Sequence, residues 1–172
     1  MSFPLVSIGE FCLTGSGGTP SRKIPEYFDG NIPWVKSGDL RENIVTHVTE
    51  FISDEAVKKS SAKIVKEGAI LLAMYGATVG RMAILGIEAA TNQAVCNIVP
   101  DESKAFSKYV YYALLDKVPE FLSNAVGGAQ PNISQGIIRE TKIPLPPLPE
   151  QQRIAAILDK GVTESDAWSN IR

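Results

Sequence analysis

The alternation of apolar and polar positions along the chain predicts short strands separated by loops. Residues 69–74 (AILLAM) form the longest apolar run, which is typical of a buried strand. Residues 81–85 and 94–99 are short, apolar and bounded by Gly or by Asn and Pro, so they are further strand candidates. Residues 3–13 alternate loosely, which predicts either a first strand or the entry to a helix. The pattern favours a β-rich domain.

Helical spacing occurs in two further places. Within residues 103–115 apolar side chains recur at helical intervals, and Ser103 is in position to cap the helix. Ser53 precedes two acidic residues, which is typical of a helix that begins at Asp54, while the pair Ser60-Ser61 argues against a long one. Strands and helices together predict the α+β fold class, in the form of a β-rich mixed domain.

Glycine and proline separate these elements. Residues 15–21 (GSGGTPS) are expected to lack regular structure, because glycine permits unusual backbone angles and Pro20 cannot donate to a strand ladder. Pro33 lies within the apolar segment 32–35, which predicts an edge strand or the start of a strand.

The C-terminal part predicts a stiff connector followed by a helix. The proline-rich residues 143–149 cannot form a helix interior, and Pro149 can open a helix that carries Ile154, Ile157 and Leu158 on one face. Gly161 and the weak periodicity after it indicate that this helix is cut short. The predicted division is a domain over 1–142, a connector over 143–149 and the start of a helix over 150–172.

Composition narrows the class of protein. The 172 residues fit one domain, and 44% apolar with 21% charged residues is typical of a globular chain. No run approaches the roughly 20 apolar residues that span a bilayer, and no secretory signal is expected after Met1. Cys12 and Cys96 lie in apolar stretches without a CxxC pair, so we interpret them as buried thiols of a cytoplasmic protein.

Catalytic motifs are not found in the sequence. The single histidine, His47, has no partner at metal-ligand spacing, and neither a P-loop, a GxGxxG loop nor a GxSxG elbow is present. Residues 100–104 (PDESK) resemble the carboxylate–lysine set of nucleases, but they are contiguous and precede a predicted helix, so helix capping explains them better. We therefore expect no catalytic residue, no metal and no cofactor.

Several loops carry side chains that suit contacts with DNA. Arginine and lysine bind phosphate or guanine, whereas asparagine and glutamine pair with base edges such as that of adenine. The same residue types also serve ordinary turn chemistry, and Asn92-Gln93 could equally pin neighbouring loops. A net charge of −2 requires a local basic face or a partner that shares the binding. The candidates are Thr19, Ser21, Arg22, Lys23, Lys36, Ser37, Tyr75, Arg81, Asn92, Gln93, Gln130, Asn132 and Gln135.

The order of the motifs carries a family resemblance. From about residue 5 to residue 160 the chain resembles a target recognition domain of type I restriction-modification specificity subunits (HsdS), which belong to bacterial defence. The motifs that carry it are GTPS at 18–21, IPWV at 32–35, GDL at 38–40, YGATVG at 75–80, TNQA at 91–94, GGAQPNI at 127–133 and IPLPPLPEQQRI at 143–154.

The resemblance implies a domain that reads one half of a split target in double-stranded DNA. It also implies assembly with a modification subunit, which methylates adenine, and with a restriction subunit, and these partners would supply the cofactor and metal chemistry. Residues expected to bind the partner lie on the C-terminal helix: Glu150, Gln151, Arg153, Ile154, Ile157 and Leu158.

The chain departs from this family in its length. A full specificity subunit carries two recognition domains joined by two long antiparallel helices, whereas one domain and the start of one helix are expected here. Such a half-subunit could form a homodimer through Ile154, Ile157, Leu158 and Trp168. Two alternatives stay open: a fragment that competes for the modification subunit without binding DNA, and a piece of a fused restriction-methyltransferase enzyme.

Overall fold

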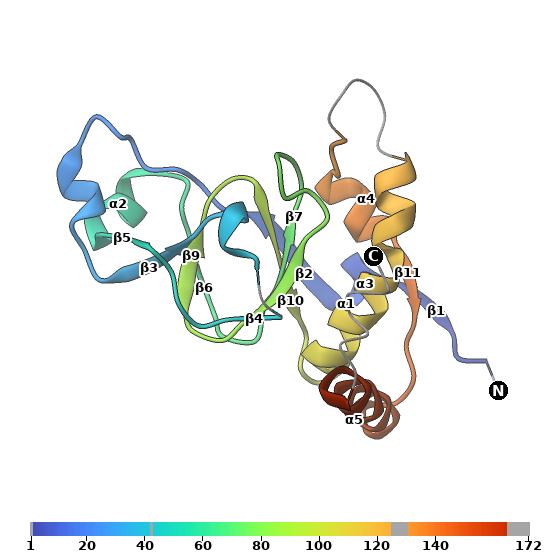
Figure 1. The fold of residues 1–172 in the computed structure, drawn as a ribbon. Helices are drawn as coiled ribbons and strands as arrows, with labels where there is room; N and C mark the ends of the chain where they lie inside the picture. The colour runs from blue at the N-terminus through green and yellow to red at the C-terminus, as the bar shows by residue number, and fades with distance from the viewer. Residues whose placement is uncertain (1, 42, 125–130, 165–172) are drawn as a thin grey trace.

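Two larger β-sheets, a small two-stranded sheet and a layer of helices make up the described part of the structure (Figure 1). The computed structural model describes residues 2–41, 43–124 and 131–164. The larger sheet has the order β2-β10-β7-β8-β4 and is antiparallel except for the pair β8–β4. Its strands are β2 (Cys12–Ser16), β10 (Val95–Pro100), β7 (Ile70–Ala73), β8 (Met82–Leu85) and β4 (Ile44–Val45).

The second sheet has four short strands in the order β5-β3-β9-β6, with β3 and β9 parallel. Three short helical segments accompany the two sheets: η1 (Pro25–Phe28), η2 (Ser37–Asp39) and α2 (Asp54–Lys59). The strands are β5 (Glu50–Ile52), β3 (Ile32–Val35), β9 (Ala89–Thr91) and β6 (Ile64–Val65).

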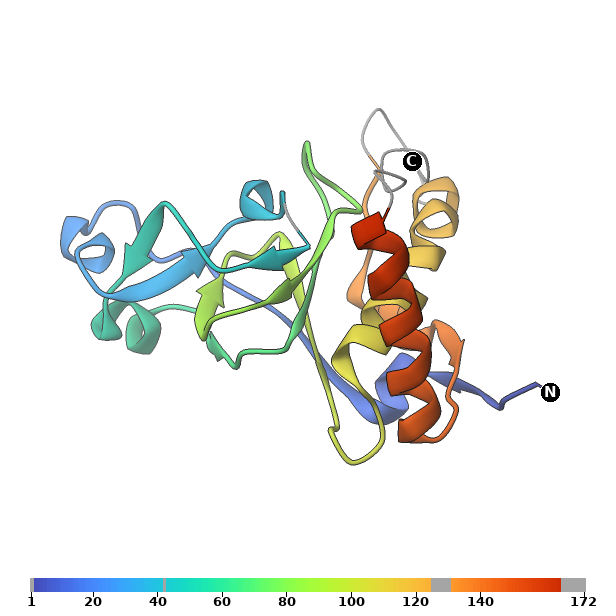
Figure 2. The same ribbon diagram turned by 60° about the horizontal axis from the view of Figure 1, so that its bottom comes forward.

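Helices cover the face of the larger sheet that points away from the second sheet (Figures 1 and 2). A two-stranded antiparallel sheet, β1 (Leu5–Ser7) with β11 (Lys142–Pro144), lies at the same end. The helices are α1 (Ile8–Phe11), α3 (Ser107–Asn124), α4 (Gln135–Glu140) and α5 (Leu148–Glu164). None of the helices in the described ranges is long and apolar enough to cross a membrane.

Burial on both faces of β7 explains the apolar run in the sequence. Ile70 and Leu72 pack into the core beneath the helices, whereas Leu71 and Ala73 pack into the core on the other face of the sheet. Successive side chains of a strand point to opposite faces, so a strand with both faces covered must be apolar throughout. The predictions of strands at 69–74, 81–85 and 94–99 are confirmed by β7, β8 and β10.

The N-terminal segment contains both elements that its pattern allowed, because β1, α1 and β2 follow one another within residues 5–16. The expectation that residues 15–21 lack regular structure was wrong for Gly15 and Ser16, which pair with Asn97 and Cys96 of β10. Backbone hydrogen bonds to an interior strand override the freedom of the glycine. Residues 17–21 form no strand or helix.

Of the two alternatives predicted from Pro33, the edge strand is wrong, and a position near the start of a strand is what β3 has. β3 lies between β5 and β9, and the pairing with β9 starts only at Trp34. Pro33 therefore sits near the start of an interior strand, where its missing N–H is tolerated. This correction concerns long-range pairing, which the local pattern does not contain.

The predicted short helix is confirmed as α2, whose N-cap Ser53 accepts a hydrogen bond from the backbone N–H of Ala56. The longer helix begins at Ser107 and continues to Asn124, so the start and the cap expected at Ser103 were wrong. Asp101 accepts hydrogen bonds from the N–H and the hydroxyl of Ser103, which forms a separate turn. Residues 101–104 therefore precede the helix and do not cap it.

The C-terminal helix is fastened to the domain by a buried amide. Gln151 is fully buried, its Nε2 donates to the carbonyl oxygens of Lys104 and Pro146, and its Oε1 accepts from the N–H of Phe106. Helix α5 also runs through Gly161 to Glu164, because one glycine lowers helix propensity by only about 1 kcal/mol.

A second contact ties α5 to α3 further along. Asp159 accepts hydrogen bonds from the Lys108 ammonium at 2.8 Å and from the Tyr112 hydroxyl at 2.5 Å. With Gln151, this contact fixes the direction of α5 relative to the rest of the domain.

Replacing Gln151 should destabilise the protein strongly. Gln151→Leu keeps the side-chain volume but leaves the half-buried N–H of Phe106 and the carbonyl groups of Lys104 and Pro146 without their partner, which should cost about 2–4 kcal/mol. Gln152→Leu makes the same change at the exposed neighbour and should alter the free energy of unfolding by less than about 0.5 kcal/mol. Urea unfolding measures both, and equal effects would contradict the buried role of Gln151.

Candidate nucleic-acid interface

Loops that are distant in sequence meet along the upper edge of the molecule in Figure 1. The Thr78 hydroxyl, in the loop between β7 and β8, donates to the carbonyl oxygen of Ser37 in η2 at 2.9 Å. The N–H of Ile133, ahead of α4, donates to the carbonyl oxygen of Met74 at 2.7 Å. These bonds join η2, the β7–β8 loop and the segment before α4 into one edge, which we call the loop edge.

The glycine-rich loop at 17–21 is anchored to the four-stranded sheet. The N–H of Gly18 donates to the carbonyl oxygen of Thr91 at 2.9 Å, and Trp34 Nε1 donates to the carbonyl oxygen of Gly18 at 3.1 Å. The Thr19 hydroxyl donates to Gln93 Oε1, so two predicted site residues are in contact. The loop is therefore held against β3 and the segment that follows β9.

Glu50 forms ion pairs with two of the cationic residues predicted for the site. The Arg22 guanidinium donates to both carboxylate oxygens of Glu50, at 2.8 and 3.2 Å, and the Lys36 ammonium donates to Oε1 at 2.9 Å. The hydrogen bonds from Arg22 and Lys36 hold the pKa of Glu50 below its ordinary value. Sequence reasoning missed Glu50, because only the pairing of β5 with β3 places it opposite Trp34.

Other predicted residues lie along the same loops. Lys23 is exposed, and its N–H donates to the Ser21 hydroxyl oxygen at 3.3 Å. Asn92 Oδ1 is buried and has no hydrogen-bond partner in the part of the chain that the structure describes. Ser37 lies in η2 and is half-buried.

The remaining candidates flank the β7–β8 loop. Tyr75 and Arg81 are exposed at its two ends, and Asn132 is exposed beside Ile133. Gln135 is half-buried as the first residue of α4, whose N-cap is Ser134. Gln130, together with the glycine pair before it, lies outside the described residues.

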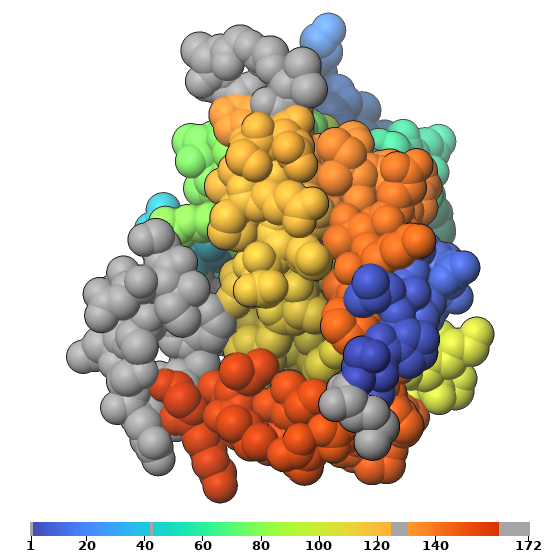
Figure 3. Space-filling model, turned by 90° about the vertical axis from the view of Figure 1, so that its right-hand side faces the viewer, coloured from blue at the N-terminus to red at the C-terminus, as the bar shows by residue number. Residues whose placement is uncertain are grey.

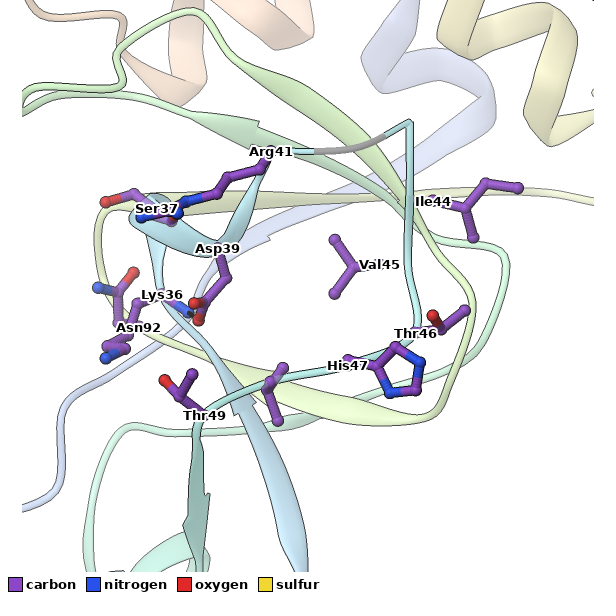
Figure 4. Close-up of a pocket in the computed structure, with 12 residues that line it drawn as sticks. Lys36, Ser37, Asp39, Arg41, Ile44, Val45, Thr46, His47, Thr49 and Asn92 are labelled. Carbon is purple, nitrogen blue, oxygen red and sulfur yellow. Dashed lines mark hydrogen bonds between the residues drawn. The ribbon is translucent and has the colours of Figure 1, made fainter.

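A hollow of about 690 Å³ opens beside η2 (Figure 4). Lys36, Asp39 and Asn92 lie on one side of it, and Thr46 and His47 lie on the other. The wall carries both charges, from Lys36, Arg41 and Asp39, and the Asp39 carboxylate accepts the Lys36 backbone N–H at 2.9 Å. In the described ranges no group of three or more His, Cys, Asp or Glu side chains is arranged to hold a metal ion.

Both cysteines are buried thiols, as predicted. Burial raises the pKa of Cys12 to about 12, and the nearby charge of Asp101 adds to the effect. Burial likewise raises the pKa of Cys96 to about 12. Both side chains are therefore protonated at neutral pH and pack as small apolar groups.

Helix α5 crosses the lower part of the face seen in Figure 3, below α3 and α4. Ile157 and Leu158 are 54% and 42% exposed, whereas Ile154 packs partly against the core. Gln151 is buried and does not share the exposed face with the other residues predicted to bind a partner. Glu150 and Arg153 pair with each other at 2.6 Å, and Trp168 lies outside the described residues.

The sequence of this chain is similar to a known family and to known proteins. A family model described as the type I restriction modification DNA specificity domain matches residues 3–166. The chain is 36% identical over 156 residues to the type I restriction enzyme MjaIX specificity subunit of Methanocaldococcus jannaschii, covering 88% of this chain and 35% of that protein. It is 31% identical over 160 residues to the EcoR124I/EcoR124II specificity subunit of Escherichia coli, covering 90% and 39%.

Solved structures share the fold. The HsdS subunit from Thermoanaerobacter tengcongensis gives a TM-score of 0.75 at 22% identity, over 99% of this chain and 40% of that chain. A chain from a study of complex assembly and conformational transition of the type I R-M system gives a TM-score of 0.78 at 24% identity over the same shares.

Two sheets flanked by helices thus define a mixed domain of the HsdS fold, and the predicted α+β class is confirmed. The chain belongs to the type I restriction modification DNA specificity domain family, which confirms the resemblance in its motifs. It spans 35% to 39% of the length of the two curated relatives.

Close packing of Gly17 predicts a sensitive position in the anchored loop. A Cβ atom added at Gly17 would overlap the carbonyl oxygen of Thr91, so Gly17→Ala should lower the free energy of unfolding by about 1–3 kcal/mol. A Cβ added at Gly15 meets nothing within 4 Å, and Gly15→Ala should be nearly neutral. Urea unfolding compares the two, and a neutral Gly17→Ala would show that the loop is not anchored at Thr91.

The Glu50 cluster predicts a pH-dependent difference in stability. A lowered pKa means that the ionised carboxylate stabilises the fold above its ordinary pKa of 4.5, and that this stabilisation is lost as pH falls through the lowered pKa. Glu50→Gln should therefore lower the Tm at neutral pH, and the difference from wild type should shrink as the pH falls through the lowered pKa of Glu50. Thermal unfolding across this range tests it, and a constant difference would contradict the ion-pair origin.

Proposed function

We propose that this chain is a DNA-recognition module that reads part of a double-stranded target through the loop edge and the anchored loop. The observation that carries the proposal is the placement of the predicted DNA-contacting side chains. Segments far apart in sequence bring them onto neighbouring loops, in a chain of the DNA specificity family. Loops on a rigid scaffold are where recognition residues of folded domains concentrate.

The charges of this chain favour contacts with particular bases over a general attraction to the phosphates of DNA. The net charge is −2, and Arg22 and Lys36 share one carboxylate, so the cluster of three charged groups has a net charge of only +1. Tight binding to phosphates over a long stretch needs many cations. The module therefore depends on a partner for much of its affinity.

That partner, in our proposal, is a modification subunit, with a restriction subunit joining the assembled complex. The relatives are named as subunits of type I restriction enzymes. Ile157 and Leu158 on α5 offer an exposed apolar contact, with Glu150, Arg153 and Ile154 beside them. In the alternative, a second copy of this chain binds the same face of α5 and forms a homodimer. Gln151 is buried, so it holds α5 to its own domain and is not part of this contact.

In this proposal the parts of the chain and the partner subunits have separate roles. We propose that residues 1–142 recognise DNA, that residues 143–149 connect, and that residues 150–172 begin the spacer helix. Methyl transfer and cleavage belong to the partner subunits, with their cofactors and metal ions, and this chain has no catalytic activity of its own. The cytoplasm is the expected location, since it keeps thiols such as Cys12 reduced.

The central test is selection from a library of randomised split-site duplexes, with and without the modification subunit. We expect a defined sequence to be enriched in the presence of the subunit. A chain that binds the modification subunit but enriches no sequence would support the alternative, a fragment that competes for this subunit without reading DNA.

Variants locate the interface. Arg81→Ala, at the exposed end of the β7–β8 loop, should weaken DNA binding about 10-fold. If Arg81 contacts a phosphate, the slope of the logarithm of affinity against the logarithm of salt concentration should also fall by about one. Lys142→Ala removes an exposed cation from β11, in the separate two-stranded sheet, and should leave affinity unchanged. Fluorescence anisotropy across a salt series measures both, and equal losses would argue against the loop edge.

A further inference from the structure

Arg22 is fixed in orientation while its side chain remains 56% exposed. The guanidinium carbon lies 4.2 Å from the centroid of the Phe28 ring and 5.2 Å from that of Trp34. Two N–H groups donate to the Glu50 carboxylate. A guanidinium has five N–H donors, so three stay free for a ligand.

The support of Arg22 belongs to the core. Trp34 is only 1% exposed, belongs to the small core that includes Ile52, and makes an edge-on contact with Phe28 at 5.8 Å between ring centroids. Glu50 pairs with Trp34 across β5 and β3, and Lys36 donates to the same carboxylate. Backbone pairing, the buried Trp34 ring and the half-buried Phe28 ring thus set where the guanidinium points.

This environment suits a base edge better than a phosphate. A phosphate is an anion, so the Glu50 carboxylate that is bound to Arg22 would repel it and offset much of the attraction of the guanidinium. The O6 and N7 atoms of guanine are neutral acceptors side by side, and a guanidinium that is already oriented meets them with two donors. Ordering the arginine before binding also removes an entropic cost from recognition.

We infer that Arg22 reads a guanine in the major groove of the target, and that Glu50 is the positioning residue that orients Arg22 for it. The guanidinium lies over the Phe28 and Trp34 rings, which support it. The inference rests on the proposed function and adds to it the identity of one base and the residue that selects it.

The experiment is library selection with the assembled chain and modification subunit, comparing wild type with Arg22→Lys, Glu50→Gln and Glu26→Gln. Arg22→Lys keeps the charge but loses the planar pair of donors, and it should reduce the preference for guanine at one position by about 10-fold while leaving the other positions unchanged. Glu26→Gln removes an exposed carboxylate from η1 and should change nothing.

Glu50→Gln separates positioning from charge. It should weaken the guanine preference at that same position and make binding to unrelated DNA more sensitive to salt, because Arg22 and Lys36 become free to bind phosphates. Thermal unfolding of each variant confirms that it is folded in the assay. A purely structural role for Glu50 would lower the affinity for all sequences alike.

The outcomes distinguish failure of the inference about Arg22 from failure of the proposed function. If wild type enriches a sequence but Arg22→Lys lowers binding evenly, Arg22 contacts a phosphate and the inference is overturned. Unchanged preferences in both Arg22→Lys and Glu50→Gln overturn it as well. If wild type enriches no sequence, the proposed function fails and the inference fails with it.

Discussion

Both faces of the five-stranded sheet must be covered, and the rest of the structure follows from this constraint. On one face Ile70 and Leu72 pack beneath the helices, and on the other Leu71 and Ala73 pack into a separate core. A strand that is apolar on both sides is stable only between two layers. The helical layer, which ends in α5, and the second sheet, which carries the charged cluster, are therefore held in one unit.

The anchored loop turns this scaffold into a recognition surface. Gly18 is bonded to Thr91 and Trp34, and Trp34 in turn supports Arg22. At the opposite layer, Gln151 and Asp159 fix the direction of α5. Loops and helix are thus both tied to one scaffold, on opposite sides of the five-stranded sheet, and in our proposal this tie relates the DNA half-site to the partner subunit.

Much of the fold was predictable from local pattern, and the failures have physical causes. The strands β7, β8 and β10 and the cap of α2 follow from periodicity and side-chain chemistry. Residues 103–106 were mistaken for helix, because the Asp101 carboxylate stabilises a turn that competes with it. Glu50 was missed as a site residue, since its role depends on the register of two strands that are separated in sequence.

The sequence by itself determined the fold class, the buried strands, the two buried thiols and the family, because these depend on composition, spacing and ordered motifs. Tertiary structure alone decided that Arg22 and Lys36 share one carboxylate and that Gln151 faces inward. The reason is the same in each case. A polar side chain has many local partners available in sequence, and only the pairing of strands and helices selects the one that it meets.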